Sequence, residues 1–353
     1  MLKTLIASLV VICALGCGSN KPTGGAQDAS PDTPPSTGTK LKVVYIPKSA
    51  GNPYFTSVQT GFEKAAKEYG FDFTLQAPTN AETTSQLGVI QDQVQQKVDV
   101  IAISPNSNDA LNEALDQASK EGILVITVDA DLTGNEAKRA FSVLASDSKA
   151  IGEGQLELMG KLMNYEGDFA ILSATSDAPN QNAWIAALQA AMKDPKYAKM
   201  KLVATVYGDD EMQKSTTEAE GLFSKYPNLK GILSPTSVGL AAAAQVLETA
   251  GVFPGGPNAK NGGVFLTGLS TPDQMRASVE KGVVISFQLW SPEDMGYAAG
   301  YLASQVKQGK AEIKNGASIE VPSLGAVRVG ENNVIYAAPV VTFDKNNIGN
   351  YHF

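Results

Sequence analysis

Two hydrophobic periodicities alternate along the sequence from residue 41 onward. Short apolar runs bounded by turn residues predict strands, and the run at 100–103 is apolar at every position. Continuous apolar runs are typical of parallel strands that are covered on both faces. Between such runs, apolar residues recur at spacings of three and four, as from Phe55 to Tyr69, which predicts amphipathic helices. The repeated strand–helix order predicts an α/β fold with parallel sheets.

The expected strands form two series that meet near residues 145–147. The first series comprises 41–46, 71–75, 98–104, 123–128 and 141–145, and the second comprises 169–173, 202–207, 231–234, 264–268 and 283–287. We therefore expect two doubly wound parallel-sheet lobes in tandem. Ligands of open parallel sheets bind at the carboxyl ends of the strands. Two such lobes predict a ligand cleft between their strand ends.

The first 39 residues have a different character. Lys3 precedes an apolar run at 5–12, and small residues lead from there to Cys17. This order is typical of a cleaved export signal, and the run is shorter than the stretch of about 20 apolar residues that spans a membrane. With a cysteine after the cleavage point, residues 1–17 resemble a bacterial lipoprotein signal, which implies a lipid on Cys17. An ordinary signal with an incidental cysteine is the alternative, and either places the mature protein outside the cytoplasm.

Residues 18–39 follow this leader and are rich in Gly, Pro, Ser and Thr, with almost no apolar side chains. Such a segment cannot bury enough surface to offset the entropy of ordering it. The composition predicts a disordered linker between a membrane anchor and a folded body.

Composition excludes several classes of function. The formal net charge is −8, whereas a nucleic-acid partner favours a basic face. The two cysteines, Cys13 and Cys17, both lie in the leader, so the body holds no disulfide, thiol nucleophile or cysteine metal site. The single histidine is His352, near the C-terminus, which leaves no histidine triad or histidine-rich metal site. We therefore expect a protein that is not an enzyme and needs neither cofactor nor metal.

The exit of the first expected strand carries Lys48, Asn52, Tyr54 and Phe55. A sugar ring has an apolar face that an aromatic plane can cover, and its hydroxyl rim suits charged or amide groups. These residues are therefore candidates for sugar binding. The alternative is that Phe55 belongs to the core and Lys48 is a solvated loop charge.

The fourth strand is followed by Asp129 and Asp131. A carboxylate at Asp129 can accept two hydroxyl hydrogens, whereas Asp131 is expected to cap a turn. An enzyme that uses these two carboxylates as acid and base is an alternative, but alternate residues of a strand exit form a poor pair for that chemistry.

Amides follow the first strand of the second series. Asn180 and Gln181 can each donate and accept a hydrogen bond, which suits hydroxyl recognition, although Asn180 could instead cap a helix. Further polar exits lie at 235–237 and 269–271. Trp290 follows the last strand, where the chain would cross between lobes, and is a candidate stacking platform.

Several of these stretches together resemble the type I periplasmic sugar-binding proteins of bacterial ABC importers, and most of all their rhamnose-binding and autoinducer-2-binding branch. The resemblance covers nearly all of residues 40–353. The stretches that carry it are 46–48, 51–55, 129–131, 180–184, 207–210, 234–236, 271–276 and 343–348.

The resemblance implies two lobes joined by three hinge crossings, with lobe 1 at 40–145 and 289–322 and lobe 2 at 146–288 and 323–353. It also implies a set of binding residues by position. These are Lys48, Asp129, Asn180, Gln181, Pro235 and Ser237, with Asn52, Tyr54 and Phe55 matching the aromatic corner of ribose-binding relatives.

Departures from the family pattern bear on the ligand. Ser270 and Trp290 stand near positions where pentose- and hexose-binding relatives have an acidic residue and a glutamine, which argues against ribose. Asn180 stands where the autoinducer-2 branch has an acidic residue. The resemblance thus favours a 6-deoxyhexose such as rhamnose, with Trp290 and Phe55 receiving its methyl group and ring face.

The family mechanism is capture by hinge closure and delivery to a membrane permease, with no nucleotide bound by the receptor itself. The expected protein is a lipid-anchored monomer in the periplasm or at the cell surface. Autoinducer-2 import is one alternative, and a sensory receptor for a chemoreceptor or kinase is another. A transcription repressor shares this fold but would carry a basic helix-turn-helix in place of the leader.

Overall fold

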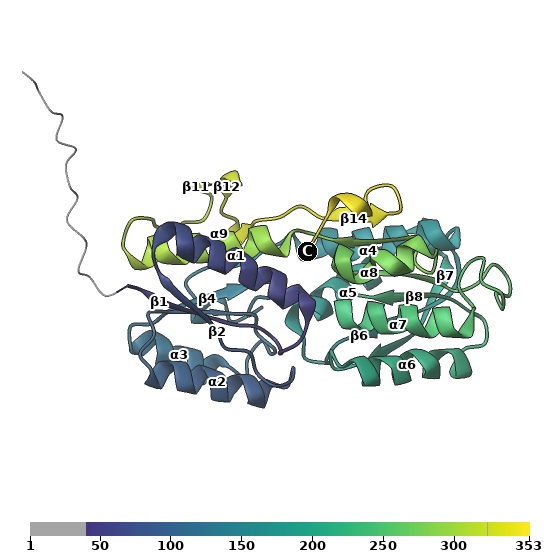
Figure 1. Cartoon of the computed structure of the whole chain (residues 1–353), viewed down its shortest axis with the longest axis horizontal. Helices are drawn as coiled ribbons and strands as arrows, with labels where there is room; N and C mark the ends of the chain where they lie inside the picture. The colour runs from purple at the N-terminus through teal and green to yellow at the C-terminus, as the bar shows by residue number, and fades with distance from the viewer. Residues whose placement is uncertain (1–39, 323) are drawn as a thin grey trace, which may run out of the picture. The chain divides into compact units, whose positions relative to one another are not determined.

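Two parallel sheets organise the computed structural model, which describes residues 40–322 and 324–353 (Figure 1). The expected signal at 1–17, including Cys17, and the expected linker at 18–39 lie outside the described residues. The first sheet, of lobe 1, has the order β13-β5-β4-β3-β1-β2. Its strands are β1 (Lys42–Ile46), β2 (Asp72–Leu75), β3 (Val100–Ile103), β4 (Leu124–Val128), β5 (Ser142–Leu144) and β13 (Val334–Tyr336).

The second sheet, of lobe 2, has the order β7-β6-β8-β9. Its strands are β6 (Glu166–Ser173), β7 (Lys199–Tyr207), β8 (Leu229–Ser234) and β9 (Phe265–Gly268). Adjacent strands run parallel in both sheets. The expected α/β architecture with two parallel-sheet lobes is confirmed.

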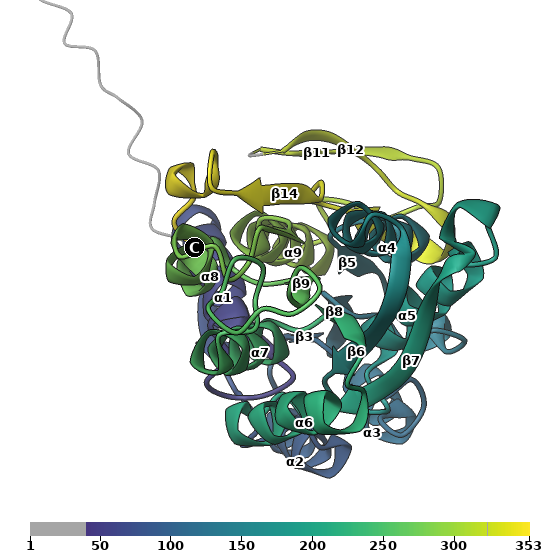
Figure 2. The ribbon, with the colours of Figure 1, turned by 90° about the vertical axis from the view of Figure 1, so that its right-hand side faces the viewer.

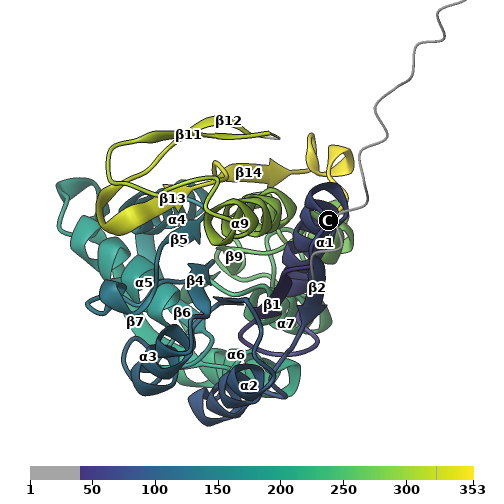
Figure 3. The same cartoon turned by 90° about the vertical axis from the view of Figure 1, so that its left-hand side faces the viewer.

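Helices cover both faces of each sheet. The helices of lobe 1 are α1 (Pro53–Tyr69), α2 (Thr83–Gln95), α3 (Asn112–Lys120) and α9 (Pro292–Lys307), and those of lobe 2 are α4 (Ser148–Met163), α5 (Pro179–Ala191), α6 (Met212–Lys225), α7 (Ser237–Ala250) and α8 (Pro272–Glu280). In lobe 1, α2 and α3 lie on one side of the sheet and α1 and α9 on the other (Figure 3). In lobe 2, α4 and α5 lie opposite α6 and α7 (Figure 2).

Alternation along each strand distributes apolar side chains to both helical layers. In β1, Val44 and Ile46 pack with the layer of α2 and α3, whereas Val43 and Tyr45 face α1 and α9. Successive side chains of a strand point to opposite faces, so strands covered on both sides need apolar residues at every position. This explains why β3 is fully buried along its whole length.

Helices α1 and α9 approach each other through glycine. A Cβ atom on Gly61 would lie 2.0 Å from the backbone oxygen of Glu293, and one on Gly296 would lie 2.1 Å from that of Val58. Only glycine permits such close backbone approach. The helix α9 follows the last strand of lobe 2 in the chain, and this packing fixes it to lobe 1.

The C-terminal segment carries strands that the sequence pattern did not predict: β11 (Ser318–Val321), β12 (Gly325–Arg328), β13 and β14 (Val341–Asp344). Strand β14 pairs antiparallel with β10 (Ser286–Leu289), which was expected at 283–287 as part of the parallel series. An isolated parallel bridge between Leu269 and Gln288 connects β10 to the exit of β9.

The lobe boundary expected at residue 323 is corrected by strand β13. Residues 334–336 pair in parallel with β5 at the edge of the lobe 1 sheet, not in lobe 2. Pairing there satisfies the backbone groups that an open sheet edge would leave unpaired. The chain crosses between the lobes after β5, after β10 and between β13 and β14.

Within the described ranges, no helix combines the length and apolar character needed to span a membrane.

Candidate functional site

The residues that the sequence predicts to bind ligand line one cavity between the strand exits of the two lobes. They are Lys48, Asn52, Tyr54, Phe55, Asp129, Asn180, Gln181, Pro235, Ser237 and Trp290. The topology brings them together because the carboxyl ends of β1 and β4 face those of β6 and β8.

Lys48 is buried, with 3% of its surface exposed, so the alternative of a solvated loop charge is wrong. Its Nζ donates to the carbonyl oxygen of Pro105 at 3.0 Å, and its own carbonyl accepts from Asn106 Nδ2 at 2.9 Å. Burial lowers the pKa of the Lys48 ammonium, and the carboxylates of Asp129 and Asp210 partly offset that effect. The first strand exit therefore holds a fixed cation inside the cavity.

Asp129 occupies the exit of β4 in a left-handed backbone conformation, with φ of 70°. Its Oδ1 accepts from the hydroxyl of Tyr54 at 2.7 Å, and its Oδ2 accepts from Asn180 Nδ2 at 3.2 Å. Burial raises the pKa of the Asp129 carboxyl, while Lys48 and Tyr54 oppose the rise. A non-glycine residue held at positive φ stores strain, which is found most often at functional sites.

Asn52 links the start of α1 to the other lobe. Its Oδ1 caps the helix by accepting from the backbone N–H of Tyr54 at 3.0 Å, and Pro53 occupies the first helical turn. The same oxygen accepts from Ser237 Oγ, at the start of α7, at 3.2 Å. Together with the bond from Asn180 to Asp129, this contact joins the two lobes directly across the cleft.

The amides of α5 have different roles. The helix begins at Pro179 after Ala178, so the alternative that Asn180 caps it is wrong, and the Asn180 amide faces Asp129 instead. The Oε1 of Gln181 accepts from Ser173 Oγ at 2.7 Å and from the N–H of Ala174 at 2.8 Å. Gln181 thereby fixes the exit of β6, so any donation to a ligand comes from its NH₂ group.

Aromatic rings form one wall of the cavity at the second crossing. Trp290 has an exposed fraction of 2% and donates from Nε1 to the hydroxyl of Tyr54 at 2.8 Å. Its ring lies edge-on to that of Trp184, with centroids 5.7 Å apart, and Tyr54 is edge-on to Phe55 at 5.2 Å. Phe55 both belongs to the core and lines the cavity.

The sequence reasoning missed Trp184 and Asp210, which also line the cavity. Asp210 follows β7 and accepts from Thr236 Oγ1. Burial raises the pKa of its carboxyl, against the effects of Thr236 and Lys48. The two acidic residues just after β7, Asp209 and Asp210, were the available signal in the sequence.

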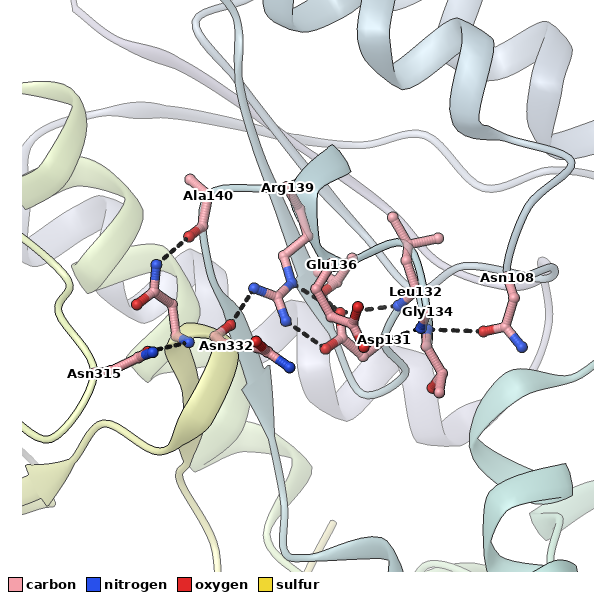
Figure 4. Close-up of polar contacts among 12 residues, drawn as sticks. Asn108, Asp131, Leu132, Gly134, Glu136, Arg139, Ala140, Asn315 and Asn332 are labelled. Atoms are coloured by element: carbon pink, nitrogen blue, oxygen red, sulfur yellow. Dashed lines mark hydrogen bonds and ion pairs between the residues drawn. The ribbon is translucent and has the colours of Figure 1, made fainter.

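Asp131 is part of a buried ion pair, beyond the expected turn cap (Figure 4). Its Oδ1 accepts from the N–H of Leu132, but both carboxylate oxygens also bind the guanidinium of Arg139, at 2.9 and 2.6 Å. Arg139 NH1 in turn donates to the carbonyl oxygen of Asn332, next to β13. Arg139 thereby connects the loop after β4 to the C-terminal segment of lobe 1. Asp131, through which it does so, lies two residues after Asp129 in the sequence.

The charged side chains of the described residues do not form a metal site. Across residues 40–322 and 324–353, no group of three or more His, Cys, Asp or Glu side chains is placed to hold a metal ion. The cavity instead combines one ammonium, two carboxylates, amides and aromatic rings. These groups can accept, donate and stack on a neutral polar ring.

Comparison with known proteins agrees with this geometry. The sequence profile of the periplasmic binding protein domain matches residues 43–311. The D-allose-binding periplasmic protein of Escherichia coli is 26% identical over 255 residues, which cover 70% of this chain and 79% of that protein.

Solved structures show the same arrangement. An ABC transporter solute-binding protein from Clostridium phytofermentas with bound L-rhamnose superposes with a TM-score of 0.82 at 32% identity, covering 89% of this chain and 98% of that one. LsrB from Clostridium saccharobutylicum, in complex with AI-2, has a TM-score of 0.81 at 24% identity, covering 89% and 100%. The chain therefore belongs to the periplasmic binding protein family.

Proposed function

We propose that the protein captures a monosaccharide, a 6-deoxyhexose such as rhamnose, between its lobes and delivers it to an ABC permease. The observation that carries this proposal is the cavity itself, in which groups from both lobes converge on one small space. Carboxylate, ammonium and amide groups suit the hydroxyl rim of a sugar, and the wall of Trp290 and Phe55 suits a methyl group and ring face. The similarity to an L-rhamnose-bound solute-binding protein supports the same choice.

Closure of the lobes is the proposed mechanism of capture. Because Asp129 belongs to lobe 1 and Asn180 to lobe 2, a ligand gains its full set of contacts only when the lobes approach. A ligand shifts such an equilibrium by its difference in affinity for the two forms. Small-angle scattering with and without sugar tests this step, and an unchanged radius of gyration at saturating sugar would contradict it.

The ligand itself is tested by calorimetry of the purified protein with L-rhamnose, other monosaccharides and autoinducer-2. We expect rhamnose to bind most tightly. Autoinducer-2 is the second choice, supported by the fold shared with the AI-2 complex. It is opposed by Asn180, because the family resemblance implies an acidic residue at this position in the autoinducer-2 branch. Tight binding of autoinducer-2 without binding of rhamnose would reverse the order.

The leader supports a further part of the proposal, in which a lipid on Cys17 and the linker at 18–39 keep a monomeric receptor close to its permease. Tethering raises the effective concentration of the receptor at the permease without any new contact. In Cys17→Ser, sugar binding should be unchanged and the protein should leave the membrane fraction. A variant that stays with the membrane would exclude the lipid anchor, and loss of binding would mean that anchoring and capture are not independent.

A further inference from the structure

The exit of β7 is built as a tight turn with an aspartate at both central positions. The backbone N–H of Glu211 donates to the carbonyl oxygen of Gly208 at 2.9 Å, which closes a four-residue turn. The two central residues, Asp209 and Asp210, have φ of 53° and 55°. Positive φ at both central positions is the signature of a type I′ turn, for which glycine, asparagine and aspartate are the favoured residues.

The two aspartates of this turn lie in different surroundings. Asp209 forms an ion pair with Lys214, and both side chains are more than 40% exposed. Asp210 points to the ligand cavity, where it accepts from Thr236 Oγ1. Asp209 therefore has an ordinary surface role, whereas Asp210 places a carboxylate in the cavity.

Packing holds the turn against α6, so Asp210 has a fixed position. A Cβ atom on Gly208 would lie 2.1 Å from Ser215 Oγ and 2.9 Å from Ser215 Cα. The N–H groups of Gly208 and Asp209 continue the pairing with β6 by donating to Ser173 and Ala174. The carboxylate of Asp210 is thus presented to the cavity by rigid backbone on both sides.

The charges of the cavity do not balance. Among its lining residues in the described ranges, Lys48 is the one cation, and Asp129 and Asp210 are the carboxylates. When all three groups are ionised, one ammonium and two carboxylates leave an excess of negative charge in the cavity. Within a cavity of low dielectric constant, that excess repels an anionic ligand strongly and favours hydroxyl groups, which can donate to the carboxylates.

We propose that Asp210 is a specificity-determining residue of the sugar site, which accepts a ligand hydroxyl from lobe 2 and excludes sugar acids and sugar phosphates by its charge. This inference rests on the proposed function, since it needs a monosaccharide in the same cavity. It goes beyond that function by assigning the discrimination between neutral and anionic sugars to one side chain.

The test compares Asp210→Asn with Asp209→Asn, which changes the same side chain at the neighbouring position of the same turn. Calorimetry measures the binding of L-rhamnose and of a hexuronate to the wild type and both variants. Asp210→Asn should weaken rhamnose binding by roughly tenfold to a hundredfold, the range for losing a hydrogen bond to a charged group. It should also strengthen hexuronate binding relative to rhamnose, whereas Asp209→Asn should change neither.

Thermal unfolding of the same samples separates recognition from folding. Asparagine adopts the left-handed backbone conformation as readily as aspartate does. Both variants should therefore keep or raise the unfolding midpoint of the ligand-free protein. Rhamnose binding by Asp210→Asn as tight as in the wild type would overturn the inference while leaving the proposed function intact. A lowered midpoint in Asp210→Asn, or an unchanged preference for rhamnose over hexuronate, would also overturn it. A wild type that binds no monosaccharide would instead remove the proposed function, and this inference with it.

Discussion

Asn180 of lobe 2 donates from Nδ2 to Oδ2 of Asp129 in lobe 1 at 3.2 Å, so the cleft is closed by a direct amide–carboxylate bond. The bond requires a donor at position 180, because the facing group is a buried carboxyl. The Asn180 amide is therefore expected to hold the two lobes together as well as to influence the choice of ligand.

Asn180→Asp should open the ligand-free protein and weaken sugar binding by about tenfold or more. The change removes the donor and places a second carboxylate against Asp129, and two close carboxylates repel each other in a buried site. Small-angle scattering should show a larger radius of gyration than that of the wild type, and calorimetry should show the loss of affinity. Asn182→Asp, two residues along the same helix and bonded to the backbone of Ser176, is the matched control. Equal scattering curves for Asn180→Asp and wild type would contradict the prediction.

Arg139→Met should lower the free energy of unfolding by about 3–5 kcal/mol, because it leaves Asp131 charged in a site where 11% of its side chain is exposed. The double variant with Asp131→Asn should recover part of this loss, which a urea-denaturation cycle can measure.

The adjacent pair of Lys138 and Asp116 is the control for this cycle, since its side chains are 29% and 40% exposed. Removing Lys138 should cost less than about 1 kcal/mol. If Arg139→Met and Lys138→Met proved equally mild, the ion pair with Asp131 would not anchor the loop that carries Asp129.

Gly61→Ala and Gly296→Ala should each destabilise the protein by about 1–3 kcal/mol or more, since the added methyl group meets backbone of the facing helix. Gly88→Ala is the matched control within α2, where a Cβ has open space and alanine has the better helix propensity. That variant should be more stable by up to about 1 kcal/mol. Urea midpoints measure all three, and equal effects at Gly61 and Gly88 would refute close packing of α1 on α9.

The stability of ligand-free protein should fall as the pH rises above about 4, through the contribution of Asp129 and Asp210. Burial raises the pKa of each carboxyl above its ordinary value near 3.9. Between the unfolded and the folded pKa, the folded state binds more protons than the unfolded state, so the free energy of unfolding decreases as the pH increases.

Asp210→Asn removes one of these groups and should be more stable than the wild type at pH 7. The difference should shrink as the pH falls toward about 4, because the carboxyl of the folded wild type then becomes protonated and its buried charge is lost. Unfolding midpoints between pH 4 and 7 measure it, with Asp209→Asn as the control. A difference that is independent of pH would show that Asp210 carries no buried charge.

Local pattern predicted the parallel strands because each buried strand is a short apolar run, and hydrophobic periodicity is a property of neighbouring residues. It also placed Lys48, Asp129 and Asn180 around one ligand cavity, because the carboxyl ends of parallel strands lie at one edge of a sheet. Their assignment to sugar binding stays a prediction until a ligand is measured.

Strand β13 could not be predicted from local pattern. Its three residues form a strand only by pairing with the open edge of β5, about 190 residues earlier in the chain. The ion pair of Asp131 could not be predicted from local pattern either, because it depends on the loop that brings Arg139 back to the carboxylate.

The sequence by itself determined the two-lobed α/β architecture and the set of polar strand exits that meet in the cleft, since both depend on periodicity and chain direction. Only the tertiary structure decided how those groups are paired, that Asp210 joins them, and that one ammonium and two carboxylates line the same cavity. Charge balance and donor–acceptor pairing depend on distances between residues from different strands, and those distances exist only after the lobes have packed.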